Sequence, residues 1–264
     1  MHKLRLGRSL SATLPNFEER LKEIKQVGFD TIDFDVCGFR KLGDNEDEMI
    51  ASALELLPTV KEVGLALNAI HIPFGRLWDI STLDEEVRLE AIQKIAAISA
   101  KADASMPVCY VIHGSYEPIP IENRTDRLAQ LKKSLLELCN LTKTPLAVEI
   151  LPRTCLLNTA KEAVELVDSL PVQVRVCVDV NHFLQETAED GVKALGERII
   201  TTHISDHDYL DEKHWLPMQG KIDWKKLLKA FEEIGYLGVF NYEVSQDCTP
   251  VEIKENYDTL FSNN

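Results

Sequence analysis

Histidines and carboxylates recur at or just after the ends of apolar stretches in this sequence. These side chains bind divalent metals and move protons in enzymes. Five of the seven histidines and four carboxylates occupy such positions: His71, His113, Glu149, Asp179, His182, His203, Asp211, His214 and Glu243. A lone histidine in a strand is usually structural, but a whole set favours one shared site. Mixed imidazole and carboxylate donors without cysteine suit Mn²⁺, Mg²⁺, Co²⁺ or an open Zn²⁺ site rather than a closed structural zinc.

The alternation of side chains along one apolar stretch indicates where its acidic residue points. In VQVRVCVDV, residues 172–180, valine occupies every second position. Because successive side chains of a strand face opposite sides, this row suits packing against outer helices. Asp179 then shares the opposite row with Arg175 and Cys177, and a carboxylate there needs a paired charge or a cation. Likewise, Glu243 is expected to point away from its neighbours Tyr242 and Val244.

The apolar stretches alternate with longer amphipathic ones, which makes eight strand–helix units in 264 residues. The expected strands cover residues 4–10, 31–36, 65–73, 108–114, 146–151, 172–180, 198–205 and 238–244, and one expected helix covers 46–63. Asn16 and Glu19 predict a capping box before the first helix. Alternation of this kind predicts a parallel sheet, and eight units predict an α/β fold: a single (β/α)8 TIM barrel domain over residues 1–264. In such barrels, the carboxyl ends of the strands bear the active site.

Composition limits the class of partner. Acidic residues number 43 against 29 basic ones, so the net charge is −14, which repels phosphate backbones and anionic membranes. No apolar run has the length of a signal peptide or a membrane span. The six cysteines form no C-x-x-C pair, which favours reduced thiols. We therefore expect a cytoplasmic protein with a small-molecule substrate, without nucleic acid or membrane as partner, and a homo-oligomer is compatible with the sequence.

Several segments resemble the xylose isomerase-like TIM barrel superfamily, which includes sugar isomerases and epimerases, inosose-processing enzymes and apurinic endonucleases. The matching segments are GFDTIDFDV, LAVEILPRT, VDVNH, HISDHDYLDEKHWLP, GKIDW and YEV, spread over most of the chain. The resemblance implies a divalent metal held by Glu149, Asp179, His203 and Glu243. It also implies that Glu149 and Glu243 act as the acid–base pair on a small ketose or polyol-derived carbonyl compound. Substrate-binding roles then fall to His71, His113, His182, Asp211 and His214.

Two alternative activities remain compatible with this resemblance. The apurinic endonucleases build a multi-zinc cluster, whose pattern here would add His71, His113, His182, Asp211 and His214. However, the loop has two residues between Asp211 and His214 where Asp-x-His is expected, and the net charge of −14 disfavours DNA. Dehydration of a keto-inositol would use the same metal and glutamates as isomerisation. A third possibility, a barrel that binds a sugar without turnover, is disfavoured by the intact metal set.

Other residues of the predicted rim loops are less specific. Phe74, Trp78 and Trp215 could stack on a sugar ring, although such residues more often close a loop onto the core. Arg153 could bind a phosphate or a carboxylate, although a solvated surface position is the commoner role for such a side chain.

Overall fold

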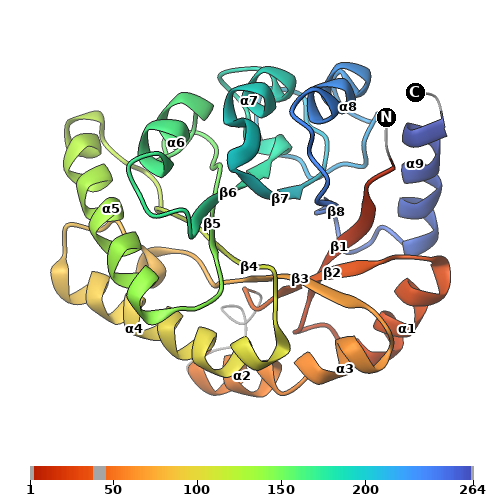
Figure 1. Ribbon diagram of the computed structural model, residues 1–264, viewed down its shortest axis with the longest axis horizontal. Helices are drawn as coiled ribbons and strands as arrows, with labels where there is room; N and C mark the ends of the chain where they lie inside the picture. The colour runs from red at the N-terminus through yellow and green to blue at the C-terminus, as the bar shows by residue number, and fades with distance from the viewer. Residues whose placement is uncertain (1–2, 38–45, 263–264) are drawn as a thin grey trace.

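Eight parallel strands surround the centre of the fold in this computed structural model, which describes residues 3–37 and 46–262 (Figure 1). The strands are β1 (Arg5–Ser11), β2 (Thr31–Asp35), β3 (Ala66–His71), β4 (Cys109–Ile112), β5 (Leu146–Glu149), β6 (Val174–Asp179), β7 (Ile199–His203) and β8 (Val239–Tyr242). Each of β1 to β6 pairs with the next strand, and β1 also pairs with β8. A parallel bridge between Ile204 and Tyr242 brings β8 beside β7. The predicted (β/α)8 TIM barrel is confirmed.

Helices cover the outside of the strands (Figure 1). They are α1 (Phe17–Val27), α2 (Glu46–Leu54), α3 (Leu57–Glu62), α4 (Glu85–Ala102), α5 (Arg124–Leu141), α6 (Ala160–Val167), α7 (Ala188–Leu195), α8 (Trp224–Glu233) and α9 (Pro250–Ser262). The described residues contain no helix with the length and apolar character needed to cross a bilayer.

Two local predictions about helices are wrong. The expected helix 46–63 is two helices, α2 and α3, because Pro58 lies in the first turn of α3, where its missing N–H costs no hydrogen bond. The capping box at Asn16 does not form. Asn16 adopts a left-handed conformation with φ of 58°, and its side chain accepts no capping hydrogen bond.

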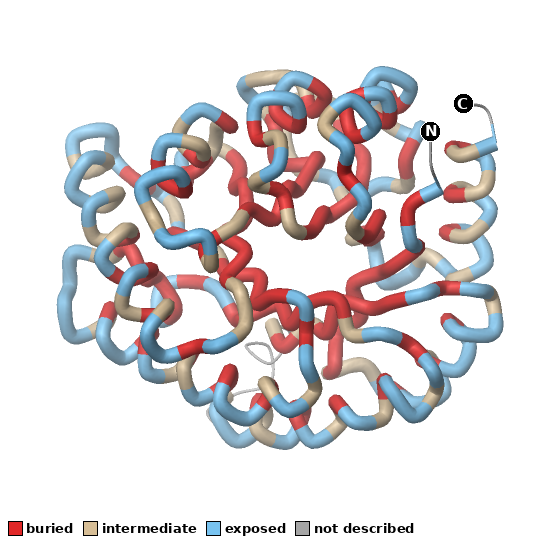
Figure 2. The backbone as a smooth tube through the Cα atoms, in the orientation of Figure 1, coloured by how far each residue is buried: buried red, intermediate tan, exposed pale blue. Residues whose placement is uncertain are grey.

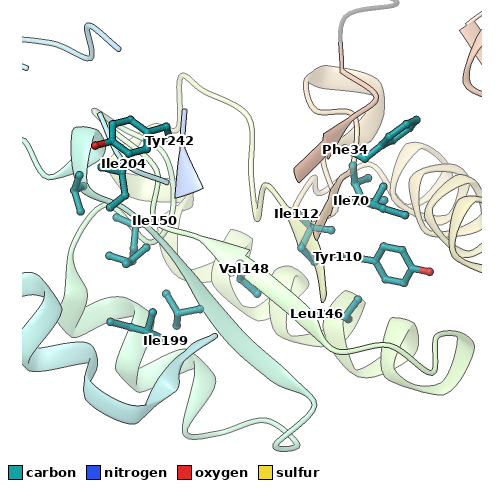
Figure 3. Packing of buried hydrophobic residues seen from close by; sticks show 14 of the residues in the cluster. Phe34, Ile70, Tyr110, Ile112, Leu146, Val148, Ile150, Ile199, Ile204 and Tyr242 are labelled. Atoms are coloured by element: carbon teal, nitrogen blue, oxygen red, sulfur yellow. The ribbon is translucent and has the colours of Figure 1, made fainter. Parts of the chain in front are cut away.

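The apolar core lies between the strands and the helices. The strands are buried along most of their length, whereas the helices expose their outer faces (Figure 2). Figure 3 shows part of this layer, in which Phe34 and Ile70 lie opposite each other on β2 and β3. Val174, Val176, Val178 and Val180 belong to the same layer. This confirms the predicted outward row except for Val172, which precedes β6 and is exposed.

The interior of the barrel holds a second, smaller cluster. Its members are the short side chains Ala69, Cys109, Val111, Ala147 and Cys177. Small residues suit the narrow interior of an eight-stranded barrel. Cys177 therefore faces inward, and Asp179, two residues further along β6, lies on the same row, toward the carboxyl end of the barrel.

Candidate active site

Four predicted metal ligands meet at the carboxyl ends of the strands. Glu149 ends β5, Asp179 ends β6, His203 ends β7, and Glu243 directly follows β8. One donor atom from each lies within 4.8 Å of the donors of the other three. His203 Nδ1 is 3.2 Å from Glu149 Oε1 and 2.9 Å from Glu243 Oε2. The structure thus brings together residues that are up to 94 positions apart in the sequence, Glu149 to Glu243.

One atom of this group is left without a hydrogen bond. Asp179 is fully buried, and its Oδ1 accepts from the backbone N–H of Asn181 at 2.7 Å, but its Oδ2 has no hydrogen-bond partner. The nearest cation candidate, His182 Nδ1 at 3.4 Å, instead contacts the Ile150 carbonyl at 2.8 Å. Burial raises the pKa of Asp179 to about 7. A buried carboxylate oxygen aimed at two other carboxylates fits a bound divalent cation.

A buried chain of polar residues orients His203 from within the barrel. Its Nε2 lies 3.3 Å from Asp33 Oδ2, and Asp33 Oδ1 accepts from the Asn68 amide at 2.6 Å. Asn68 also donates to Thr201 at 2.9 Å. A carboxylate on the far nitrogen fixes the tautomer of a metal-binding histidine and leaves Nδ1 to face the ion. Asp33 was not predicted, although its place in the alternating strand TIDFD is a signal that could have found it.

A second set of donors shares Glu149. His71 Nε2 and His113 Nε2 lie 3.2 and 3.1 Å from Glu149 Oε2, the oxygen that His203 does not contact. These three residues form another group with metal-ligand geometry. Burial alone would raise the pKa of Glu149, but the His203 and His113 rings lower it well below its usual range. Glu149 is therefore ionised between the two sets.

A third set contains a residue that was not predicted from the sequence. His182, His214 and Glu212 form a group with metal-ligand geometry, and His182 Nε2 is 3.0 Å from Glu212 Oε2. Asp211, which was predicted in this place, instead pairs with Arg153 at 2.7 Å. The extra residue in the loop explains why Glu212, rather than Asp211, contacts His182. Tyr209 and His214 both have positive φ, 64° and 51°, and the chain between them presents Glu212 to His182.

The cavity at the barrel mouth has a volume of about 260 Å³ and is lined by residues of the first, second and third sets. Phe74 forms part of its wall and stacks on His113, with ring centroids 4.2 Å apart and planes inclined by 13°. Among the other predicted rim aromatics, Trp78 is buried away from this cavity, in a groove beside α2 and α4. Trp215 is partly exposed, and its backbone pairs with that of Asp206.

Arg153 lies at the rim of the cavity, and its guanidinium pairs with three carboxylates. Glu117 Oε1 lies 2.6 Å from Nε and 2.5 Å from Nη2. On the other side, Nη1 donates to Asp211 at 2.7 Å and to Glu212 at 3.0 Å. A guanidinium has five N–H groups, so this arrangement leaves at most one of them without an acceptor. Arg153 therefore ties three rim loops together rather than presenting a free cation to the cavity.

A buried carboxylate anchors the long loop between β7 and α8 that bears Glu212 and His214. Asp206 Oδ1 accepts from the N–H groups of His207 and Ile222, at 2.9 and 3.2 Å. Its Oδ2 accepts from Met218 N and from Trp224 Nε1, both at 2.8 Å. Gly220 allows this close approach, because a Cβ there would lie 2.3 Å from Asp206 Oδ1 and from the His207 carbonyl oxygen. Asp206 was not predicted as a functional residue, although it lies in the segment HISDHDYLDEKHWLP.

Comparison with known proteins agrees with this architecture. A family model described as a xylose isomerase-like TIM barrel matches residues 21–261. D-psicose 3-epimerase from Clostridium cellulolyticum H10, solved with D-tagatose, superposes with a TM-score of 0.76 at 16% identity, and the match covers 98% of each chain. A D-tagatose 3-epimerase-like protein gives 0.79 at 20% identity, again over 98% of each chain.

Two further proteins are similar. The 3-keto-D-glucoside 4-epimerase of E. coli, in its apo form, has a TM-score of 0.78 at 18% identity, and the match covers 98% of this chain and 100% of that one. An uncharacterised protein of Sinorhizobium fredii is 35% identical over 78 residues, which are 28% of this chain and 24% of that protein. The match therefore spans about a quarter of the length of this relative.

Proposed function

Because the chain belongs to the xylose isomerase-like TIM barrel family, we propose that it is a divalent-metal-dependent sugar isomerase or epimerase. Its substrate is a small ketose or a polyol-derived carbonyl compound. The observation that carries this proposal is the group of Glu149, Asp179, His203 and Glu243 at the barrel mouth, with one carboxylate oxygen left without a hydrogen bond. The similar solved structures, named as sugar epimerases, support it.

These four residues would hold the ion through three carboxylate oxygens and His203 Nδ1. Such a donor set suits Mn²⁺, Mg²⁺, Co²⁺ or Zn²⁺. When bound, the ion supplies a Lewis acid that stabilises the negative charge developing on a carbonyl or hydroxyl oxygen of the substrate.

Proton transfer falls to Glu149 and Glu243. They approach the same region from different elements, since Glu149 ends β5 and Glu243 follows β8. Burial alone would raise the pKa of both, but His203 and further histidines lower it below the usual range, so each is available as a base. One removes the carbon-bound proton next to the carbonyl, and the other returns a proton at the opposite face or the neighbouring carbon. His182 and His214 would contact the substrate hydroxyl groups.

The rim favours a substrate without phosphate. Arg153 is the arginine that lines the cavity in the described chain, and Glu117, Asp211 and Glu212 occupy its guanidinium. A phosphate group is best recognised by two parallel N–H donors of a free arginine, and Arg153 does not offer them. Three carboxylates against one guanidinium also leave the rim negative. Phe74 adds an apolar face on which a sugar ring can pack.

The test is exchange of the carbon-bound proton in deuterium oxide, followed by proton NMR over a panel of ketoses, keto-inositols and sugar acids with and without phosphate. We expect exchange with at least one neutral ketose, loss of exchange in Glu149→Gln and in Glu243→Gln, and no change in Glu165→Gln, which lies exposed on α6. Normal exchange in either of the first two variants would refute their role. Release of water from a keto-inositol would indicate the dehydratase that uses the same residues.

The three donor sets favour one second candidate, a multi-zinc phosphodiesterase or endonuclease. Glu149 belongs to two of the sets, and His182 lies 3.4 Å from Asp179, so the sets are contiguous. The negative rim and the net charge of −14 oppose a nucleic acid substrate. Metal analysis of the purified protein separates the two: about one ion per chain supports the isomerase, whereas two or three zinc ions with cleavage of abasic DNA support the hydrolase.

A further inference from the structure

A carboxylate, a thiol and an imidazole meet beside the mouth of the barrel, outside the four-residue set. Asp35 ends β2, and its partner in the parallel register of β3 is His71. Cys37 follows two residues later, and its backbone N–H donates to Asp35 Oδ1 at 2.6 Å. Its sulfur lies 3.1 Å from His71 Nδ1 and 3.3 Å from the Ile72 carbonyl oxygen. The turn after β2 therefore places the thiol against the side of the His71 ring that faces away from Glu149.

The chemistry of these donors differs from that of the other sets. Asp35, Cys37 and His71 offer oxygen, sulfur and nitrogen atoms within 4.8 Å of one another. Among the described residues, this is the group with metal-ligand geometry that contains a cysteine. Zn²⁺ and its softer relative Cd²⁺ accept sulfur with nitrogen and oxygen, whereas Mg²⁺ and Mn²⁺ prefer oxygen-rich sets. The sulfur-containing group thus selects cations that the enzyme's main site does not require.

The surroundings of Cys37 argue against a role for its thiol as a nucleophile. Cys37 is surrounded by Asp35, Glu149 and Glu243, and burial together with these carboxylates raises the pKa of its thiol well above the usual value. A reactive cysteine needs the opposite, an electropositive surrounding. The same negative surrounding attracts a cation, and a coordinating thiol gives up its proton to the metal.

We propose that Asp35, Cys37 and His71 form a binding site for a thiophilic divalent cation, Zn²⁺ or Cd²⁺, with water in the remaining position. Binding forms bonds to an Asp35 oxygen, to Cys37 Sγ and to His71 Nδ1. The thiol proton and the Nδ1 proton of His71 leave to solvent, and no oxidation or reduction occurs. The hydrogen bond between His71 Nδ1 and the Ile72 carbonyl, 3.0 Å long, is given up.

Occupation of this site fixes what His71 does on its other side. His71 Nε2 lies 3.2 Å from Glu149 Oε2 and donates to it, and a cation on Nδ1 holds the ring in this orientation. Metal-bound histidines commonly donate in this way to a carboxylate. His71 then no longer offers Nε2 to the set it shares with His113. The hydrogen bond also weakens Glu149 as a base, so the cation inhibits the enzyme; this last consequence rests on the proposed function.

The test is titration of the full-length, chelator-treated protein with Cd²⁺, followed by ultraviolet absorption from thiolate-to-cadmium charge transfer and by equilibrium dialysis. The wild-type protein should develop the band and bind one more Cd²⁺ per chain than Cys37→Ser, which should lose the band. Cys248→Ser, which removes a half-buried thiol before α9, should keep it. Asp35→Asn, which retains the thiol, should weaken binding at least tenfold. Absence of the band from wild type, or its persistence in Cys37→Ser, overturns the proposal.

Activity provides a separate measurement. Zn²⁺ in excess over the catalytic metal should suppress proton exchange in the wild-type protein and in Cys248→Ser, but should do so at least tenfold less effectively in Cys37→Ser. Equal inhibition in all three overturns the regulatory role. If no substrate undergoes exchange, the proposed function fails, while the cadmium band still decides whether the site exists.

Discussion

The buried carboxylate of Asp206 should be worth more to stability than any exposed helix cap in the same loop. In Asp206→Asn, one oxygen becomes an NH₂ group that faces two N–H donors. Whichever oxygen is replaced, two buried N–H groups lose their acceptor, either those of His207 and Ile222 or those of Met218 and Trp224. At roughly 1–3 kcal/mol for each unsatisfied group, the expected loss is about 4 kcal/mol.

Urea unfolding followed by circular dichroism measures this loss as a fall in the free energy of unfolding at constant m-value. The matched control is Asp223→Asn, which makes the same chemical change at the exposed N-cap of α8, where the side chain accepts from Lys226 N at 3.1 Å. Asn caps helices as well as Asp does, so this variant should lose less than about 1 kcal/mol. A loss in Asp206→Asn that matches the control would refute the anchoring role.

Three further predictions concern other buried groups. Gly220→Ala should destabilise by about 3 kcal/mol in urea, because its Cβ would meet Asp206 Oδ1 at 2.3 Å, whereas Gly235→Ala meets nothing within 4 Å and should lose about 1 kcal/mol for its positive φ. Burial lowers the pKa of His207 to about 4 from 6.5, so the unfolded chain gains a proton first as the pH falls. Stability should therefore drop by about 2 kcal/mol between pH 6.5 and 4, after solvent screening is allowed for, and His207→Gln should flatten that slope; an unchanged slope contradicts it. Asp179→Asn should raise the Tm of the chelated protein, since it relieves carboxylate repulsion, and should abolish stabilisation by Mn²⁺; a lower chelated Tm would count against this.

The strand positions of the candidate site were predictable because a strand constrains its side chains strongly. Once β5, β6 and β7 are recognised, the period of two places each side chain inside or outside, and the parallel sheet places each strand end at one rim. Glu149, Asp179 and His203 follow from those two rules. The grouping of their donor atoms within 4.8 Å agrees with that prediction, whereas their catalytic roles stay predictions until exchange is measured.

Loop positions were harder to predict, because no periodicity governs them. The choice between Asp211 and Glu212 depends on two residues with positive φ and on a loop path in which both carboxylates reach Arg153 but Glu212 also reaches His182. Neither is visible in a pattern of residue types. Cys37 illustrates the same limit, since its role depends on a turn that returns its sulfur to within 3.1 Å of His71.

Because the strands and the loops hold different parts of the site, substitutions in the two regions should have different effects. His203 is held by Asp33 and Asn68, all three on strands and nearly inaccessible to solvent. Glu117, Arg153 and Glu212 shape the entrance from loops alone. Substitutions in these loops therefore leave the orientation of His203 unchanged. Directed evolution confined to the loops should shift substrate preference without compensating mutations in the core. Libraries that randomise the strands should instead yield mostly inactive chains.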